Sequence, residues 1–347
     1  MTPFEGDGLW LRCALHAHTT NSDGELAPDL LARHYEWAGY DVLAITDHWV
    51  RTNERSTRRL LVIPSTELNA RCGGPEHDAH VLALGVEADP VPPENEFGPL
   101  QEVVAWIAAN GGVPYIAHTY WSGLRTEQWE GCEGLAGLEV WNAGCELELG
   151  RGDASQQWDE ALEHGHRLLG IATDDSHHPG YDSGFAWTMV RAAEKSREAV
   201  LDALRSGAFY GSTGPEIAAV DVTDDAVTVR CSPARAVTLY TGRMRGARAN
   251  AEPGRRRVRR PLARARGQRA AGPARGRALP GRALRRPRAR RRRPEEVGRA
   301  LRRALAAGEG RARGGERADG LRRPALRALA PRRPAGRGGR RGCTGLS

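Results

Sequence analysis

Two imidazole side chains lie one residue apart in the segment LHAHTTNSDG near the amino terminus. His16 and His18 follow an apolar run, and side chains two residues apart on an extended strand project from the same face. Such a pair can bind one divalent ion, although neighbouring histidines serve equally well as structural residues. The pair alone therefore leaves both interpretations open.

Side chains of metal-binding types also follow later apolar segments. They are Asp47 and His48 ending DVLAITDH, Glu67 after LLVIPST, His118 ending VPYIAH, and Asp175 and His177 in LLGIATDDSH. Burying a charged group at the end of an apolar strand costs free energy unless the group is paired, hydrogen-bonded or bound to a metal. Because imidazole and carboxylate together suit Zn, Mn or Fe, we expect a hydrolytic metal site with an open position for water.

Two further candidates have competing interpretations. Asp23 comes shortly before Pro28, so its isolated role is to cap a helix or form a turn. His80 begins the segment HVLALG instead of ending it. A strand parallel to the others would put His80 at the wrong edge of the sheet, whereas a return strand from Glu67 would put it at the same edge.

The elements that must position these residues run from Trp10 to about Ser206. Strands are expected in WLRCALHAH, DVLAITDH, LLVIPSTE, HVLALGV, VPYIAH, LAGLEVWN and LLGIATDD, and helices in LAPDLLARHYEWAG, QEVVAWIAANGG, ASQQWDEALEHG and SREAVLDALRSG. Alternation of strands and helices is typical of parallel α/β sheets and barrels. In such folds polar residues at the carboxyl ends of the strands converge on one face.

Composition divides the 347-residue chain near residue 240. Every histidine and aromatic residue lies at or before Tyr240, and the sequence after Ala251 is almost wholly Arg, Ala, Gly and Pro. Residues 1–240 contain 37 acidic and 16 basic side chains, while the remainder contains 6 and 35. The net charge of +8 therefore averages an acidic part and a basic part, and it does not indicate a nucleic-acid-binding enzyme.

The basic tail has three interpretations. It is a basic arm that contacts nucleic acid, an Arg-rich linker without a partner, or the product of a shifted reading frame in a GC-rich gene. The tail contains no lysine, aromatic residue or repeat of the kind that basic arms usually include. This composition favours the shifted frame over nucleic-acid binding.

Other sequence features indicate a soluble, cytoplasmic protein without a membrane partner. The six cysteines form no C-x-x-C pair, which is typical of reduced thiols in the cytosol. The amino-terminal segment MTPFEGDGLWLR lacks the pattern of a signal peptide, and no apolar run approaches membrane-spanning length.

The segments HAHTTNSDG, ITDHW, STEL, IAHTYW and ATDDSHH, in this order, resemble the PHP superfamily, named for its polymerase-associated and histidinol-phosphatase members. The resemblance covers residues 10 to 215. It implies a distorted seven-stranded (β/α)7 TIM-like barrel with two or three divalent ions. The segment LEVWNAGCE resembles the branch that includes carbaryl-hydrolase-like proteins and nucleotide phosphatases.

The resemblance also implies three groups of ligands: His16, His18, Glu67 and Asp175; Glu67, His80 and His118; and Asp23, His48 and His177. Glu67 would thus bridge two ions. Family members often have a histidine at the position of Asp23, which leaves the metal preference of the third group open.

We expect three regions: a PHP metallohydrolase barrel over 8–212, a small and incomplete β appendage over 213–245, and the low-complexity tail over 246–347. The expected reaction is hydrolysis of a phosphate ester of a small substrate, such as a nucleotide, by metal-activated hydroxide. His178 and Asp182 are candidates for the proton donor or for support of the third group. Arg151 is a candidate for contact with the substrate phosphate, although a loop arginine is usually only solvated.

Other hydrolases remain open. Many amidohydrolase-type barrels bridge their metals with a carboxylated lysine, but the only lysine is Lys195, late in the chain. A TatD-like nuclease bridged by glutamate avoids this objection and fits the T-D-H and D-x-H segments less well. A carboxyl or carbamate ester is an alternative substrate for the same hydroxide. A non-catalytic module that binds metal or nucleic acid is the remaining class.

Overall fold

The computed structural model describes residues 3–4, 7–73, 78–88, 98–223, 226–240 and 246–251. Nearly all of the basic tail lies outside these residues, so the interpretations of the tail stay predictions. Among the described residues, no helix is long and apolar enough to cross a membrane. The five cysteines within them are free thiols, and Cys343 lies outside.

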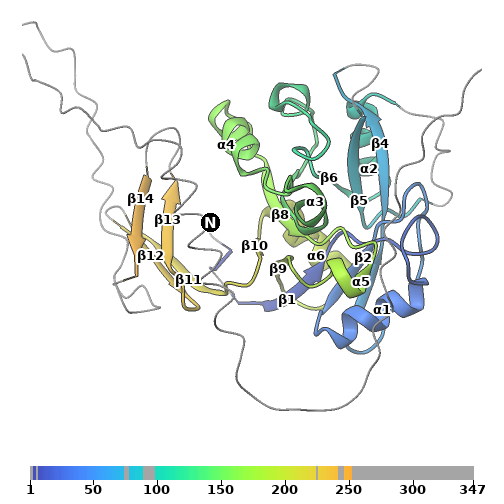
Figure 1. Ribbon diagram of the computed structural model, residues 1–347, viewed down its shortest axis with the longest axis horizontal. Helices are drawn as coiled ribbons and strands as arrows, with labels where there is room; N and C mark the ends of the chain where they lie inside the picture. Colours follow the sequence, from blue (N-terminus) through green and yellow to red (C-terminus); the bar gives the residue numbers. More distant parts are fainter. Residues whose placement is uncertain are drawn as a thin grey trace, which may run out of the picture. The chain divides into compact units, whose positions relative to one another are not determined.

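The first of two five-stranded sheets contains the amino-terminal strand and has the order β10-β9-β1-β2-β3 (Figure 1). Its strands are β1 (Leu9–Ala14), β2 (Val42–Ile45), β3 (Leu61–Pro64), β9 (Trp187–Ala192) and β10 (Phe209–Ser212). β1, β2 and β3 are parallel, while β9 pairs antiparallel with both β1 and β10. The sequence did not lead us to expect β9 and β10. β9 occupies the second edge of β1, and β10 lies beyond β9.

The second sheet has the order β4-β5-β6-β7-β8. Its strands are β4 (Thr66–Arg71), β5 (Asp78–Leu84), β6 (Val113–Ile116), β7 (Gly137–Asn142) and β8 (Leu169–Thr173). β5 is antiparallel to both β4 and β6, and β6, β7 and β8 are parallel. The hairpin of β4 and β5 confirms the return-strand interpretation of HVLALG.

Helices connect the strands of the two sheets. They are α1 (Pro28–Trp37), α2 (Leu100–Ala109), α3 (Ala143–Leu149), α4 (Ser155–Glu163), α5 (Pro179–Asp182) and α6 (Arg197–Ser206), with a short 3-10 helix η1 (Thr126–Gln128). Pro28 begins α1, where its missing N–H costs no hydrogen bond. The side chain of Ser196 caps α6 by accepting a hydrogen bond from the backbone N–H of Ala199.

A central apolar core lies between the inner faces of the sheets. It includes Leu11 and Cys13 of the first sheet, Leu82 and Tyr115 of the second, and Leu201 of α6. Separate apolar clusters join the outer faces to the helices, with α1 on the first sheet and α2 on the second. Both sheets are thus buried on two sides, which explains their continuous apolar strands.

The α/β class is confirmed, but the expected closed seven-stranded barrel is not found. Among the described residues, no hydrogen-bonded pair of strands joins the two sheets. A barrel would need β8 to pair with β1, and β9 already occupies that edge of β1. The two sheets instead touch at isolated bridges, between Ala17 and Ser176 and between His48 and Glu67.

These bridges draw the carboxyl ends of the strands together. The backbone N–H of His18 donates to the carbonyl oxygen of Ser176 at 2.9 Å, and that of Trp49 donates to Glu67 at 3.0 Å. The bridging residues are candidate ligands or their neighbours. The seam between the sheets therefore positions the candidate site.

Four strands follow β10 in the chain: β11 (Ile217–Val222), β12 (Val227–Cys231), β13 (Ala236–Tyr240) and β14 (Gly246–Asn250). They form two antiparallel pairs, β11 with β12 and β13 with β14. β14 lies beyond residue 245, where we expected the appendage to end. The functional division of the chain at residues 212 and 245 stays a prediction.

Candidate metal centre

The structure brings all nine expected ligands together. Loops after β1, β2, β6 and β8 carry seven of them, and the hairpin strands β4 and β5 carry Glu67 and His80. A cavity of about 700 Å³ is lined by seven of the nine: Asp23, His48, Glu67, His80, His118, Asp175 and His177. His16 and His18 are fully buried.

The first ligand group places two carboxylate oxygens beside a pair of imidazole nitrogens. His16 Nε2 lies 3.0 Å from His18 Nε2 and 3.1 Å from both Glu67 Oε2 and Asp175 Oδ1. His18 Nε2 lies 3.3 Å from Glu67 Oε2 and 3.2 Å from Asp175 Oδ1. Tetrahedral zinc with bonds of about 2.0–2.1 Å separates its ligand atoms by about 3.3 Å. His16, His18 and Asp175 therefore offer three atoms close enough to hold one ion, and Glu67 Oε2 lies beside both imidazoles as a fourth candidate.

An unsatisfied oxygen supports this fit. Asp175 Oδ1 is buried and accepts no hydrogen bond, whereas Oδ2 accepts one from Asn142 Nδ2 at 3.0 Å. A buried carboxylate oxygen without a donor is costly, and a cation would satisfy it. The donor set and the unsatisfied oxygen both fit a divalent metal ion.

His16 is oriented by a residue that sequence analysis missed. Its Nδ1 lies 2.7 Å from Oε1 of the fully buried Glu139 in β7, which leaves Nε2 facing the ligand group. Glu139 also accepts hydrogen bonds from Thr173 Oγ1 at 2.6 Å, from the backbone N–H of His118 at 2.9 Å and from Asn142 Nδ2 at 2.8 Å. A carboxylate behind a ligand histidine fixes its tautomer and orientation. The available signal was a lone acidic residue inside the apolar strand GLEVWN.

The second ligand group is built on the other oxygen of Glu67. Glu67 Oε1 lies 2.9 Å from His80 Nδ1 and 3.3 Å from His118 Nε2. The antiparallel pairing of β4 and β5 places Glu67 and His80 on facing strands. One carboxylate thus directs one oxygen to each histidine group, which is the arrangement of a bridging ligand.

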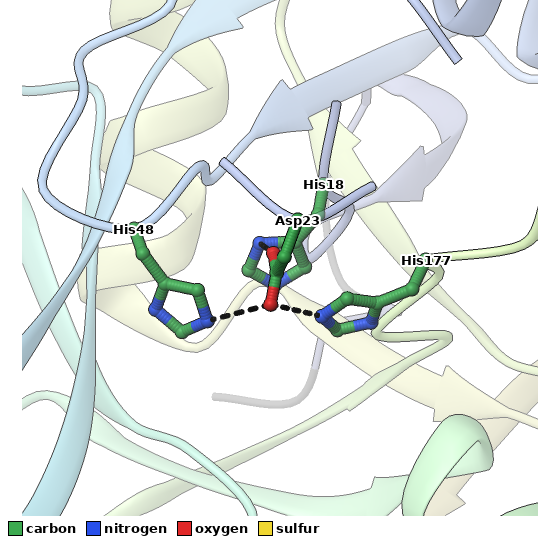
Figure 2. A group of neighbouring side chains, drawn as sticks. All are labelled: His18, Asp23, His48 and His177. Atoms are coloured by element: carbon green, nitrogen blue, oxygen red, sulfur yellow. Dashed lines mark ion pairs between the residues drawn. The ribbon is translucent and has the colours of Figure 1, made fainter. Parts of the chain in front are cut away.

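The third ligand group lies at the opening of the cavity. Figure 2 shows Asp23 between two imidazoles: Asp23 Oδ2 is 3.4 Å from His177 Nε2 and 3.7 Å from His48 Nε2. His18 Nδ1 is 3.5 Å from Asp23 Oδ1, and one atom from each of these four residues lies within 4.8 Å of the others. The Asp23 side chain is 53% exposed, in contrast to the buried first group. His18 therefore contacts both the first and the third groups.

Backbone strain is concentrated in the ligand segments. Among the described non-glycine residues, positive φ angles occur at Trp49 (58°), His118 (25°) and Asp175 (53°). His118 and Asp175 are candidate ligands, and Trp49 directly follows His48. Side chains with a Cβ rarely adopt these angles unless the surrounding structure enforces them.

The charges in the cluster favour a cation. Burial by itself lowers the pKa of His18, but the neighbouring carboxylates of Asp175 and Glu67 outweigh it and raise the pKa to about 9. Burial raises the pKa of Glu67, but His16 and His80 outweigh it and hold the pKa well below its ordinary value. Protons on the imidazoles thus balance the carboxylates, and a bound metal would take their place.

Asp47, the neighbour of His48, does not join the ligand groups. It is fully buried, and it accepts hydrogen bonds from the backbone N–H and the hydroxyl of Thr19 and from the hydroxyls of Ser22 and Thr52. Asp47 therefore holds the loop after β1 in place. Its oxygens are already occupied by these donors, so Asp47 stays outside the three ligand groups.

The remaining candidates differ in position. Asp182 is buried, and its oxygens accept hydrogen bonds from Ser176 Oγ at 2.6 Å and from the backbone N–H groups of His177 and His178 at 2.9 and 2.8 Å. It therefore holds the ligand loop after β8. The His178 side chain is 65% exposed and lines the cavity. Arg151 lies outside the cavity lining, with its guanidinium 5.3 Å from the ring centroid of Tyr120.

Comparisons with known proteins bear on the fold. No family model and no curated protein matches this sequence. A two-domain protein from Bacteroides vulgatus containing a predicted PHP-like metal-dependent phosphoesterase is 18% identical, with a TM-score of 0.45 over 69% of this chain and 80% of its own. An amidohydrolase from Chromobacterium violaceum is 17% identical, with a TM-score of 0.36 over 49% of this chain and 89% of its own.

A further similar structure is the lesion-specific endonuclease PfuEndoQ from Pyrococcus furiosus, which is 11% identical, with a TM-score of 0.41 over 57% of this chain and 56% of its own. None of these scores reaches 0.5, so the interpretation of the site rests on its own geometry. The structural neighbours of this chain include a PHP-like phosphoesterase and an amidohydrolase, and the chain itself contains buried, histidine-rich clusters that are suited to metal ions.

Proposed function

We propose that this chain is a metal-dependent hydrolase of the PHP superfamily that cleaves phosphate esters of small substrates. The observation that carries the proposal is the position of Glu67, whose Oε2 faces His16 and His18 and whose Oε1 faces His80 and His118. A carboxylate shared by two histidine groups is the arrangement needed to hold two adjacent ions. Adjacent ions are typical of enzymes that cleave phosphate esters.

Each ligand group has a place in this proposal. One ion would be held by His16, His18, Glu67 and Asp175, a second by Glu67, His80 and His118, and a third by Asp23, His48 and His177. Divalent ions such as Mn, Zn or Fe would neutralise phosphoryl charge and lower the pKa of a water molecule. Glu139 keeps His16 Nε2 directed at the first group, and Asp182 holds the backbone of His177.

His178 is our candidate for the proton donor to the leaving oxygen. Its exposed imidazole lines the cavity beside His177, and its Nδ1 lies 3.6 Å from Glu25 Oε2. An imidazole side chain can both donate and accept a proton in general acid–base catalysis. Asp182 already accepts three hydrogen bonds and therefore acts as a positioning residue in this proposal.

A small substrate fits the dimensions of the cavity. Its volume of about 700 Å³ is within the range of pockets that enclose one small molecule, such as a nucleotide. We further propose that residues 8–212 carry the activity and that the basic tail does not contribute to it. Removal of residues after Gly242 should then leave hydrolysis unchanged.

A carboxyl or carbamate ester is a second candidate substrate, and one observation favours it. Among the described residues that line the cavity, none is lysine or arginine. Phosphate sites commonly use such side chains, whereas a neutral ester needs no cation besides the metals. A phosphate would therefore depend on the metal ions for its charge compensation.

A substrate panel on the Mn-, Zn- and Fe-loaded protein tests the proposal. The panel contains nucleoside monophosphates and bisphosphates, aryl phosphates, aryl carbamates and a single-stranded oligonucleotide. We expect turnover of phosphate monoesters that is lost in Glu67→Gln and retained in the matched control Glu127→Gln, which changes an exposed glutamate on η1. Turnover of carbamates without any phosphate would establish the second candidate, and cleavage of the oligonucleotide alone would indicate a nuclease.

A further inference from the structure

The part of the cavity lining that lies outside the ligand groups, referred to below as the wall, has a chemistry of its own. Trp121 comes from the loop after β6, Leu147 and Glu148 come from α3, and Tyr181 comes from α5. None of these residues belongs to the ligand groups. They are the surfaces that a leaving group would meet while its phosphate lies at the metal ions.

Trp121 and Glu148 form a fixed pair. The indole ring lies edge-on to the ring of His118, with 5.0 Å between the centroids, and Trp121 Nε1 donates a hydrogen bond to Glu148 Oε2 at 2.9 Å. The bond uses one carboxylate oxygen, and the described residues provide no hydrogen bond to Glu148 Oε1. The indole of Trp121 thus lies between Glu148 and the candidate ligand His118, and Glu148 Oε1 is available to accept a hydrogen bond from a ligand.

Apolar surface surrounds this pair. The side chains of Leu147 and Tyr181 are 39% and 64% exposed, and both line the cavity. Exposed apolar side chains inside a cavity provide a surface for a flat or aromatic group. The wall therefore combines apolar contact with one oriented carboxylate.

The charge of the wall excludes one class of leaving group. Glu148 and Asp182 are the acidic residues of the cavity lining outside the ligand groups, and no lysine or arginine opposes them among the described lining residues. A second phosphate or a carboxylate on the leaving group would face Glu148 without a counterion. The carboxylate of Glu148 would repel a negatively charged leaving group, whereas an ammonium group would form a charge-assisted hydrogen bond with it.

We propose that Trp121 and Glu148 select phosphate esters whose leaving group has an aromatic or flat apolar body and a cationic amine. This inference rests on the proposed function for the position of the phosphate. Trp121 contacts the body of the leaving group and orients Glu148, and Glu148 binds the amine. Nucleoside bisphosphates are poor substrates under this arrangement.

Three aryl phosphates that share a para-alkylphenol body test the inference: the phosphates of tyramine, of 4-ethylphenol and of 3-(4-hydroxyphenyl)propionate. For the metal-loaded protein we expect kcat/KM to fall in that order, with about 10-fold or more between the amine and the carboxylate. In Glu148→Gln the difference should shrink to about 2-fold, mainly through KM, while Glu127→Gln keeps the wild-type order. Equal kcat/KM for the three esters, or a difference in Glu148→Gln as large as in the wild type, overturns the proposal.

Binding of the free phenols separates this inference from the proposed reaction. Calorimetry with the metal-loaded protein should show tyramine binding about 10-fold tighter than 3-(4-hydroxyphenyl)propionate, and Glu148→Gln should abolish the preference. If no ester is hydrolysed but the preference is present, the proposed function fails and the recognition of the amine is supported. If wild-type protein binds both phenols equally, the inference fails whether or not the esters are hydrolysed. Trp121→Phe keeps an aromatic surface and frees Glu148, so it should retain binding of 4-ethylphenol and weaken the preference for tyramine.

Discussion

His16 Nδ1 donates a hydrogen bond to Glu139 Oε1 over 2.7 Å, and both side chains are fully buried. The same carboxylate accepts three further hydrogen bonds, one of them from the backbone N–H of His118. Glu139 thereby fixes one ligand of the first group by its ring and one ligand of the second group by its backbone. This residue couples the two groups without belonging to either.

Replacing Glu139 with glutamine should loosen the metal centre. The amide has nearly the same shape, but it accepts hydrogen bonds through one oxygen only and carries no charge to orient His16. Substitutions behind a metal-binding histidine typically weaken affinity by about 10- to 100-fold. Competition with a chelator, followed by metal analysis, measures the change, and Glu127→Gln serves as the control. An affinity equal to that of the wild type would show that Glu139 does not orient the ligand.

Substituting Glu67 with glutamine should remove at least one metal ion per chain. The amide cannot direct a negatively charged oxygen to each histidine group, so the second group would keep only His80 and His118. Elemental analysis of protein purified in excess Mn or Zn measures the stoichiometry. The purified variant is first checked by thermal unfolding, because a folded protein with full occupancy would contradict the bridging role.

The nine candidate ligands could be named from sequence because a metal site needs donors of few types, and here most of these residues follow apolar segments. His80 required knowledge of strand direction, since only an antiparallel β5 places it beside Glu67. Glu139 and Asp47 were harder to assign. A buried carboxylate can hold backbone and hydroxyl groups or bind an ion, and its neighbours in space decide which.

The arrangement of the strands was predicted less well than their existence. β9 alternates half-buried and buried side chains, but nothing local shows that it pairs with β1 along the edge that β8 would need to close the barrel. Pairing partners are set by contacts between distant segments, which a local pattern does not contain. The position of Arg151 over Tyr120 is also a property of loop geometry that its sequence neighbours do not reveal.

The third ligand group should be the most easily emptied. Its carboxylate, Asp23, is half-exposed, and its distances to His48 and His177 are longer than the distances within the first group. Asp23→Ala should therefore remove one ion, leave the buried ions in place and change the melting temperature little. Asp23→His supplies another nitrogen donor and should restore zinc binding better than manganese binding. Metal analysis of the two variants measures this, and loss of all ions in Asp23→Ala would show that the groups fill together.

Metal binding should offset the loss of stability that the metal-free protein shows at alkaline pH. The pKa of His18 is raised to about 9 from 6.5 in the metal-free protein, so its contribution to stability is present below 6.5 and is lost as the pH rises through 9. The pKa of Glu67 is held below its ordinary 4.5, so its contribution is present above that value and is lost in acid. The metal-free protein should therefore lose stability between about pH 6.5 and 9.

Metal ions need neutral imidazoles, so the metal-dependent rise in melting temperature should be larger at about pH 9 than at about pH 6. Thermal unfolding in chelator and in excess Mn at both pH values measures the two trends. A metal-dependent rise that is equal at both values would mean that His18 does not exchange its proton for a metal ion.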